Sequence, residues 1–351
     1  MQSSRISRRR FLGASAGALA ATALPQIVRA QGKKELVFVG FGGSYQEGQT
    51  KALFEPFEKE TGIKVVQTTG VDIAKLRAQV QSKNVEWDLI SIPDRLRYTA
   101  LKDGLLMPLD YKVITNSKEV QPQALVTEYA VGCVTIPMLL TYSTKAYAQG
   151  KAPLTWPDFW DAKKFPGPRG YYNAPTYSLE FALIADGVPK DKLYPIDVPR
   201  ALKSLDRVKP DVKVWWSQFP QPGVLLKSGE ITATPWTRSI TFMLDGEPIG
   251  ISYEGAALTY EAWVVPKGAP NADNAMRFIN WALQPKPQAE LTKYIAFGPT
   301  NSKAMALVDP KLRPLLSSDP ENIKKGFLLS GDWWGPNLDK VNEAWNEWRL
   351  K

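Results

Sequence analysis

The order of short apolar runs in the first third of the chain restricts its fold more than any other feature. Residues 36–39, 63–66 and 88–92 are runs of the length and composition of buried strands. Residues 44–62 and 72–83, which lie between these runs, have the spacing of apolar residues typical of helices. Alternation of strands and helices predicts a parallel sheet covered by helices on both faces. The sequence therefore predicts an α/β fold.

The start of the first helix is predicted from a capping motif. Ser44 and Glu47 have the spacing at which each side chain can hydrogen-bond to the backbone amide of the other residue. Pro56 lies within the same helical pattern, where proline removes a backbone donor. We therefore expect Ser44 to cap this helix and Pro56 to kink it.

The middle and the end of the chain continue the alternation of strands and helices. Thr155 has the position of a helix N-cap, and Pro157 falls in the first turn after it. Trp156 and Trp160 are expected in a core, and the C-terminal tryptophans are expected to pack the tail. The further expected helices are residues 178–186, 197–206, 272–284 and 337–351, and the expected strands are residues 212–216, 231–235 and 260–265.

The first thirty residues have the pattern of an export signal. Arg8 and Arg9 precede an apolar stretch, residues 13–24, that is too short and too weakly apolar to span a bilayer. Small residues around Ala30 suit signal cleavage, and no cysteine follows for a lipid anchor. We predict a twin-arginine signal over residues 1–30 and a periplasmic mature protein, with an ordinary Sec signal as the alternative.

Charge and composition exclude several function classes. The formal charge is +9, and the predicted signal holds five arginines and no acid, so residues 31–351 carry +4, too little to indicate nucleic-acid binding. The chain has no histidine, which excludes Ser-His-Asp and Cys-His nucleophiles and ordinary histidine metal sites. Cys133 is the single cysteine and is expected to be a buried, inert thiol. We expect neither a metal nor a cofactor.

Several stretches together resemble family 1 extracellular solute-binding proteins, and among these the spermidine/putrescine-binding type. The resemblance extends over nearly all of the predicted mature chain, and it rests on the order and spacing of its parts. These parts are Phe41-Gly42-Gly43-Ser44-Tyr45, Phe57-Glu58-Lys59-Glu60-Thr61-Gly62, Trp87-Asp88-Leu89, Thr155-Trp156-Pro157-Asp158-Phe159-Trp160-Asp161, Gly229-Glu230, Gly298-Pro299-Thr300-Asn301 and the tryptophan-rich C-terminus.

The resemblance implies a two-lobed α/β fold of the type II periplasmic-binding-protein class, with the ligand in a cleft between the lobes. The chain would cross between lobes near residues 136–142 and 250–258, and its tail would pack on lobe two. Lobe one would comprise residues 31–138 plus 256–308, and lobe two residues 139–255 plus 309–351. A monomer is expected, which captures a small solute by hinge closure and delivers it to the membrane subunits of an ABC importer.

The resemblance also assigns positions in the cleft. Glu180 and Glu261 are the expected partners of a ligand amine, and Trp236 and Tyr45 are the expected walls. The full set of expected ligand-binding residues is Ser44, Tyr45, Asp94, Arg95, Tyr177, Glu180, Trp216, Trp236, Arg238, Tyr260 and Glu261.

Two departures from the polyamine-binding pattern leave other ligands open. Tyr177 stands where a second acid is expected, and Thr259 stands where a second tryptophan is expected. Arg95 and Arg238 fall near the cleft, and arginine forks suit carboxylates. A polyamine-like amine is the first hypothesis, and an amino acid, an opine, a carboxylate and thiamine remain alternatives.

An exported hydrolase with paired carboxylates is the competing class of function. Glu180 with Glu261, or Asp94 with Glu254, are the pairs that the sequence offers. The sequence has no nucleophile elbow, metal cluster or phosphate loop. We therefore expect a binding protein and not an enzyme.

Overall fold

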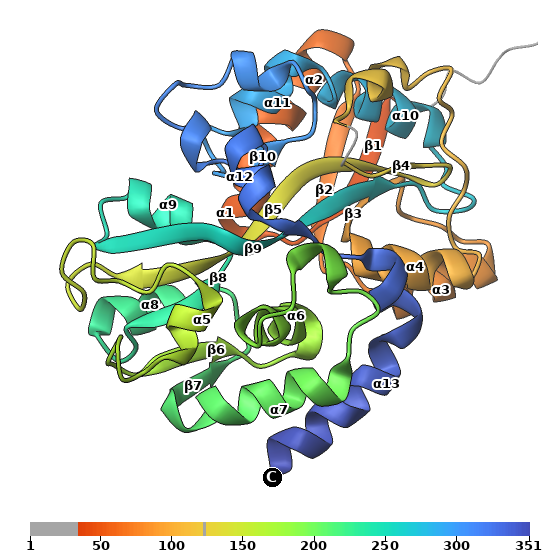
Figure 1. The fold of residues 1–351 in the computed structure, drawn as a ribbon. Helices are drawn as coiled ribbons and strands as arrows, with labels where there is room; N and C mark the ends of the chain where they lie inside the picture. Colours follow the sequence, from red (N-terminus) through yellow and green to blue (C-terminus); the bar gives the residue numbers. More distant parts are fainter. Residues whose placement is uncertain (1–33, 122–123) are drawn as a thin grey trace, which may run out of the picture. The chain divides into compact units, whose positions relative to one another are not determined.

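A mixed sheet runs through the part of the chain that the computed structural model describes, residues 34–121 and 124–351 (Figure 1). The predicted export signal lies outside these residues. The strand order along the sheet is β2-β1-β3-β9-β5-β8-β6-β7. The strands are Glu35–Gly40 (β1), Lys64–Thr69 (β2), Leu89–Pro93 (β3), Val126–Thr127 (β4), Ala130–Ser143 (β5), Arg169–Tyr172 (β6), Val212–Trp216 (β7), Ala233–Trp236 (β8), Ile249–Val264 (β9), Gly298–Pro299 (β10) and Phe327–Leu328 (β11).

The helices lie between these strands. They are Gly43–Gln49 (α1), Glu55–Thr61 (α2), Ile73–Ser82 (α3), Asp94–Lys102 (α4), Trp156–Trp160 (α5), Pro175–Ala185 (α6), Val198–Val208 (α7), Gln221–Ser228 (α8), Ser239–Leu244 (α9), Ala272–Ala282 (α10), Pro285–Leu291 (α11), Pro320–Lys325 (α12) and Gly331–Leu350 (α13). They include α4, α9, α11 and α12, which were not predicted from the sequence.

The first three strands confirm the predicted parallel sheet with both faces covered. β1 pairs in parallel with β2 and with β3. Phe38 and Leu89 are buried in the cluster that includes residues of α2 and α10, whereas Val39 and Ile90 are buried with residues of α3 and α4. Successive residues of a strand point to opposite faces, so helices cover this sheet from both sides.

The start of α1 differs from the prediction. Gly42 is the N-cap and Ser44 lies inside the helix, without a capping hydrogen bond from its side chain. Gly42 has φ 76°, which glycine adopts without steric cost, so the helix begins before Ser44. The Gly42 amide donates to Gln46 Oε1 at 3.0 Å. The predicted capping box of Ser44 and Glu47 is therefore wrong, and the Ser44 hydroxyl is available for another contact.

The prediction placed a kink at Pro56, but the α-helix is interrupted one turn earlier. Residues Thr50–Phe54 form a π-helical turn, and α2 begins directly after it with Pro56 in its first turn. The first turn of a helix needs no amide donor from proline, so Pro56 is tolerated there. The irregular turn and the proline together separate α1 from α2.

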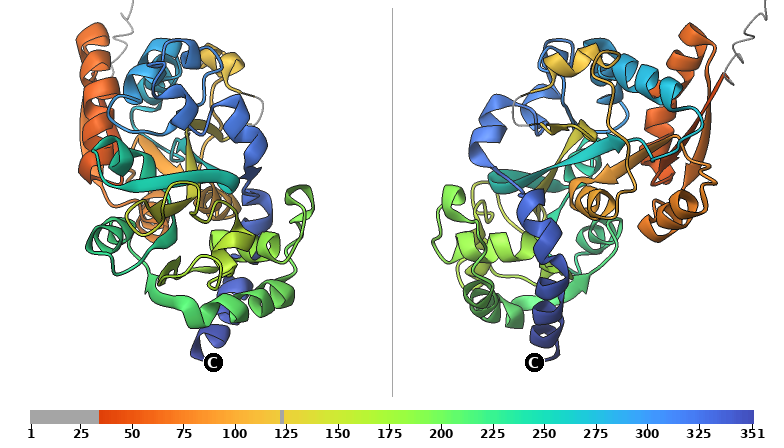
Figure 2. Two further views of the ribbon diagram at one scale, coloured as in Figure 1. Left: turned by 60° about the vertical axis from the view of Figure 1, so that its left-hand side comes forward. Right: turned by 90° about the vertical axis from the view of Figure 1, so that its right-hand side faces the viewer.

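Two long antiparallel strands, β5 and β9, join the two halves of the sheet (Figures 1 and 2). One end of β9 pairs with β3, and β5 pairs with β8 beyond a register shift between Met138 and Leu140. The segments where the chain is predicted to cross between lobes lie within these two strands. A separate aromatic core surrounds β6 and α6, where Trp156 is fully buried and stacks on Phe181 with ring centroids 3.8 Å apart.

The helix α13 begins earlier than the predicted start at Asn337. Ser330 caps it by accepting a hydrogen bond from the Trp333 amide at 3.2 Å. Gly331 and Gly335 face α4, because a Cβ on Gly331 would overlap Asp94 and one on Gly335 would overlap Tyr98. α13 also contacts α6 and α7, so the tail lies against elements from both ends of the sheet (Figure 2).

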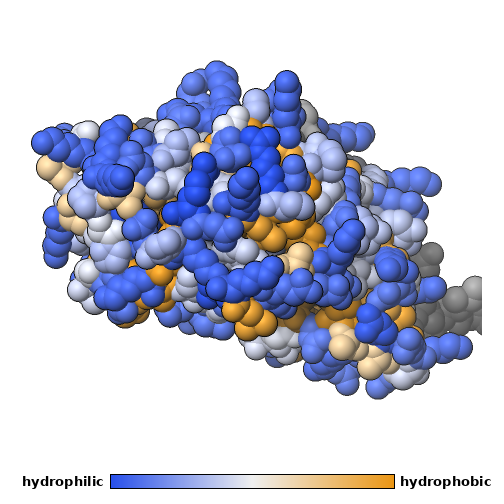
Figure 3. All heavy atoms as spheres, turned by 60° about the horizontal axis from the view of Figure 1, so that its bottom comes forward, coloured by the Kyte–Doolittle hydropathy of each residue, from blue (hydrophilic) through white to orange (hydrophobic). Residues whose placement is uncertain are grey.

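The face of the molecule that Figure 3 shows is mainly hydrophilic. On the face seen in Figure 3, hydrophilic side chains surround smaller apolar areas. No helix among the described residues has both the length and the apolar character to cross a bilayer. Cys133 is buried and unpaired with another cysteine, as predicted.

Replacing Gly335 with alanine tests the close approach of α13 to α4. Alanine favours the helical conformation by about 0.5–1 kcal/mol over glycine. The added Cβ would lie 2.2 Å from Tyr98 Cγ, so we expect the free energy of unfolding to fall by about 1–3 kcal/mol instead. Urea denaturation measures this, with the exposed Asn346→Ala as control; a more stable Gly335→Ala variant would exclude the close contact.

Candidate functional site

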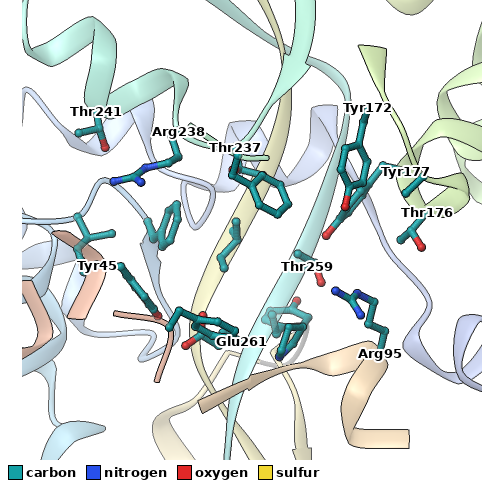
Figure 4. Close-up of a pocket in the computed structure, with 18 of the residues that line it drawn as sticks. Tyr45, Arg95, Tyr172, Thr176, Tyr177, Thr237, Arg238, Thr241, Thr259 and Glu261 are labelled. Atoms are coloured by element: carbon teal, nitrogen blue, oxygen red, sulfur yellow. The ribbon is translucent and has the colours of Figure 1, made fainter. Parts of the chain in front are cut away.

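A cavity of about 510 Å³ lies beside the two long strands (Figure 4). Residues of α1 and of the β3–α4 junction line one side of it, and residues of α6 and α9 line the other. This volume falls in the range typical of small-molecule sites. Its polar lining residues include Ser44, Tyr45, Arg95, Tyr172, Tyr177, Thr237, Arg238, Thr259, Tyr260 and Glu261.

Glu261 is the one acidic residue among the described residues that line the cavity. It projects from β9, is buried, and accepts a hydrogen bond from the Ser91 hydroxyl. Burial raises the pKa of Glu261 from its usual 4.5 to about 7, although hydrogen bonds to the carboxylate act in the opposite direction. No positive group among residues 34–121 and 124–351 therefore favours the ionised form of this carboxylate.

The Tyr45 hydroxyl points toward Glu261 from α1 (Figure 4). This hydroxyl is buried and makes no hydrogen bond of good geometry within residues 34–121 and 124–351. Burial, followed by the negative charge of Glu261, raises the pKa of Tyr45 well above its usual value, so the phenol stays neutral. A buried, unpaired hydroxyl beside a carboxylate is a position where a ligand or an ordered water completes the hydrogen bonding.

Arg238 connects the two sides of the cavity. Its Nη2 donates to Ser44 Oγ at 2.5 Å, between residues 194 positions apart in sequence. Ser44 can accept this bond because its side chain does not cap α1. The contact closes one edge of the cavity next to Tyr45.

Arg95 lies at the other end of the cavity, close to two tyrosines of the opposite side (Figure 4). Burial raises the pKa of Tyr177 to about 12 and raises that of Tyr172, and the nearby Arg95 charge opposes both shifts. Tyr177 has φ 71°, an unusual conformation for a residue with a side chain. Backbone strain of this kind concentrates at binding sites and holds a side chain in a set direction.

Seven of the predicted site residues line the cavity, and four lie outside its lining. The seven are Ser44, Tyr45, Arg95, Tyr177, Arg238, Tyr260 and Glu261. The four are Asp94, Glu180, Trp216 and Trp236.

The two acids outside the lining have partners within the protein. The Asp94 carboxylate accepts from Arg97 Nε at 2.6 Å, beside α13. Glu180 Oε1 accepts from Trp334 Nε1 at 2.6 Å and from the Tyr194 hydroxyl at 2.8 Å. Glu180 therefore ties α6 to α13 and does not form a carboxylate pair with Glu261 in the cavity.

The two tryptophans support the cavity wall from behind. Trp216 packs against Tyr172 with ring centroids 4.7 Å apart, and its Nε1 donates to Thr234. Trp236 Nε1 donates to the backbone oxygen of Phe219 at 2.6 Å. Both indoles are fully buried, so Tyr172 and Phe219 present the surface that the tryptophans were expected to present.

Sequence reasoning missed several residues of the lining. Phe41 follows β1 and Tyr172 ends β6, so both lie at the carboxyl ends of strands, where ligands of α/β sheets bind. The sequence could therefore have indicated Phe41 and Tyr172 as candidate lining residues. Phe219 and Phe297 lie in segments without a motif, and no local pattern marks them. Among the described residues, no group of three or more His, Cys, Asp or Glu side chains could hold a metal ion.

The sheet crossed by two long strands, with a polar cavity beside them, defines the two-lobed type II periplasmic-binding-protein fold. The chain belongs to the bacterial extracellular solute-binding proteins, whose family model it matches over residues 52–322. This confirms the predicted family.

Individual relatives are similar over most of the chain. A gamma-aminobutyric acid-binding protein from Pseudomonas aeruginosa is 30% identical, with 91% of this chain and 92% of that protein aligned. A spermidine/putrescine-binding periplasmic protein from Haemophilus influenzae is 24% identical over 83% of this chain and 81% of that protein. The solved structure of AgtB from A. tumefaciens R10 with agropinic acid is 41% identical, covers 90% of this chain and 99% of that chain, and has a TM-score of 0.76.

The raised pKa of Glu261 predicts a stability change for Glu261→Gln that depends on pH. The folded-state pKa of about 7 exceeds the usual 4.5, so the stabilising contribution of the carboxyl is complete below pH 4.5 and is lost as pH rises through 7. A neutral glutamine avoids this loss. We expect the ligand-free variant to exceed the wild type at pH 8 by about 1–3 kcal/mol in free energy of unfolding, and by less at pH 5.

Urea titrations at both pH values measure this difference. Glu254→Gln, which changes an exposed acid on the same strand, is the matched control and should shift neither value. A Glu261→Gln variant that is less stable than the wild type at pH 8 would show that the carboxylate is compensated in the ligand-free protein.

Proposed function

We propose that the mature chain captures a small amine-containing solute in this cavity and delivers it to the membrane subunits of an ABC importer. Membership of the solute-binding family supports capture and transport as the class of function. The observation that supports an amine is Glu261, a buried carboxylate in the cavity that has no positive partner in the part of the chain that the structure describes. The relatives named for gamma-aminobutyric acid and for spermidine and putrescine support the same ligand chemistry.

An ammonium group fits the surroundings of Glu261. It would pair with the carboxylate and remove the penalty of burying that charge alone. The Tyr45 ring lies beside Glu261 and Tyr260 also lines the cavity, and aromatic faces attract cations. The Tyr45 hydroxyl, which forms no hydrogen bond of good geometry within the described residues, can accept a hydrogen bond from the same ammonium.

Capture would proceed by hinge motion at β5 and β9, the two strands that join the halves of the sheet. We propose lobes with the boundaries expected from the sequence, residues 31–138 plus 256–308 and residues 139–255 plus 309–351. The register shift near Met138 supports a bend in β5 at this junction. The Arg238–Ser44 hydrogen bond would then join the lobes when they are closed.

Export through the twin-arginine pathway, with removal of residues 1–30, would bring the protein to the periplasm as a monomer. The paired arginines before a weakly apolar stretch support this route. The periplasmic relative that binds spermidine and putrescine supports the compartment.

A melting-temperature screen of the mature protein against amines, amino acids and opines tests the proposed function. A ligand at about 100 times its dissociation constant should add about 2.7 kcal/mol to the stability. We expect a hit among solutes with a protonated amine, and at least tenfold weaker binding by Glu261→Gln. Hits confined to solutes without an amine would contradict the proposal.

Amine binding should weaken as pH falls through 7. The ligand ammonium needs an ionised Glu261, which has a pKa of about 7 in the ligand-free protein. Tyr45 and Cys133 face this carboxylate, and both have a raised pKa and stay neutral in this range. We therefore expect about tenfold weaker binding at pH 6 than at pH 8.

Isothermal titration calorimetry at both pH values measures this change. Glu261→Gln is the matched control, and its residual affinity should be the same at pH 6 and pH 8. Equal affinities of the wild type at the two pH values would show that the amine does not bind at Glu261.

A further inference from the structure

The lining of the cavity has more positively than negatively charged side chains. Glu261 is its one acid among the described residues, whereas Arg95 and Arg238 both line it. A ligand that brings only positive charge would leave two arginines in the cavity without a negative partner. The positions of the two arginines indicate that they have different roles.

Arg238 already has a partner across the cavity. Its guanidinium donates to Ser44 at 2.5 Å, and this bond joins α1 to the start of α9. The bond therefore uses part of the donor capacity of Arg238 to hold the two sides of the cavity together.

Arg95 is not compensated in this way. The adjacent acid, Asp94, is paired with Arg97 at 2.6 Å, and Arg97 also reaches Asp332 of α13 at 3.5 Å. No carboxylate in the described part of the chain forms an ion pair with Arg95 itself. The Arg95 guanidinium is thus a free positive group that faces the cavity (Figure 4).

Hydroxyl groups gather around Arg95. Tyr172 and Tyr177 lie close enough for the Arg95 charge to act on their pKa values, and Thr259 is a hydrogen-bonding neighbour of Tyr177. Figure 4 shows Arg95 with Tyr177 and Thr259 at the end of the cavity away from Tyr45. A guanidinium with nearby hydroxyl donors is the donor set that a carboxylate prefers.

We propose that Arg95, Tyr172, Tyr177 and Thr259 form a carboxylate-binding subsite, and that the ligand is a zwitterion with its amine at Glu261 and its carboxylate at Arg95. This inference rests on the proposed function, because Glu261 is its amine partner. It narrows the ligand from amines in general to amino acids whose amine and carboxylate are separated by a chain. The strained backbone of Tyr177 then serves to hold its hydroxyl at this subsite.

Ligands that differ only in one terminal group test the amine site and the carboxylate subsite separately. The probes are ω-amino acids of increasing chain length, each compared with the monoamine and the diamine of the same length, such as γ-aminobutyrate, butylamine and putrescine. All three members of a set present the same ammonium group, and only the first presents a carboxylate. We expect the mature wild-type protein to bind the best amino acid at least tenfold more tightly than its monoamine and diamine.

Variants of the two arginines separate their roles. We expect Arg95→Gln to weaken binding of the amino acid about thirty-fold and to change monoamine binding less than threefold. Tyr177→Phe should weaken only the amino acid, by about fivefold. Arg238→Gln is the matched control, and it should weaken both ligands by the same factor, because its bond to Ser44 acts on the closed cavity. Circular dichroism and urea denaturation establish that the variants fold.

The outcomes distinguish this inference from the proposed function. If the amines bind through Glu261 but Arg95→Gln weakens the amino acid and the monoamine equally, the subsite is excluded and the amine site remains. A wild type that binds the diamine or the monoamine as tightly as the amino acid excludes the subsite in the same way. If no solute with an amine binds, the proposed function and this inference both fail.

Discussion

The buried carboxylate of Glu261, which forms no ion pair within the described residues, is the constraint on which the site depends. A carboxylate removed from water costs several kcal/mol unless a cation or several hydrogen bonds compensate it. Ser91 donates a hydrogen bond to this carboxylate, and burial nevertheless raises the pKa of Glu261 to about 7. The folded protein thus contains a carboxyl group whose ionisation becomes favourable when a positively charged ligand binds. Binding and stability are therefore opposed at this residue, as is common where a protein maintains a site for a ligand.

Glu180 shows how a carboxylate of the same kind takes a structural role. It is fully buried, and burial raises its pKa to about 7 as well. Its Oε1, however, already accepts from Trp334 and Tyr194, and Tyr194 in turn accepts from the Ser330 amide. These bonds join α6, the segment before α7 and the start of α13. Side-chain chemistry and burial alone do not separate the two acids, and the difference lies in their position, since Glu261 lines the cavity and Glu180 lies outside its lining.

The sequence predicted the first strands and helices and part of the aromatic core because their signals are local, whereas the long strand β5 and the first part of β9 were not predicted. The βαβ order, the Thr155 cap and the aromatic core around Trp156 all follow from short-range patterns, and the structure confirms them. Glycine limited the predictions at two places. Gly42 is the N-cap of α1, so the helix begins earlier than predicted and the Ser44 side chain is available for another contact. Gly331 lies in the first turn of α13, which the prediction did not include. The spacing of residues in a sequence does not encode whether a buried side chain lines the cavity or lies one layer of side chains behind it. The positions of Trp216 and Trp236 behind the lining could therefore not be predicted.

The geometry of α4 explains how one arginine stays free while its neighbours are paired. Asp94 and Arg97 are three residues apart, so they share a face of the helix and form an ion pair beside α13. Arg95 follows Asp94 by one residue, which turns its side chain about 100° around the helix axis, away from that pair. Gly331 packs closely against Asp94, so the Asp94 carboxylate contacts α13. One face of the first turn of α4 thereby contacts the C-terminal helix, and another presents to the cavity a guanidinium that forms no ion pair within the described residues.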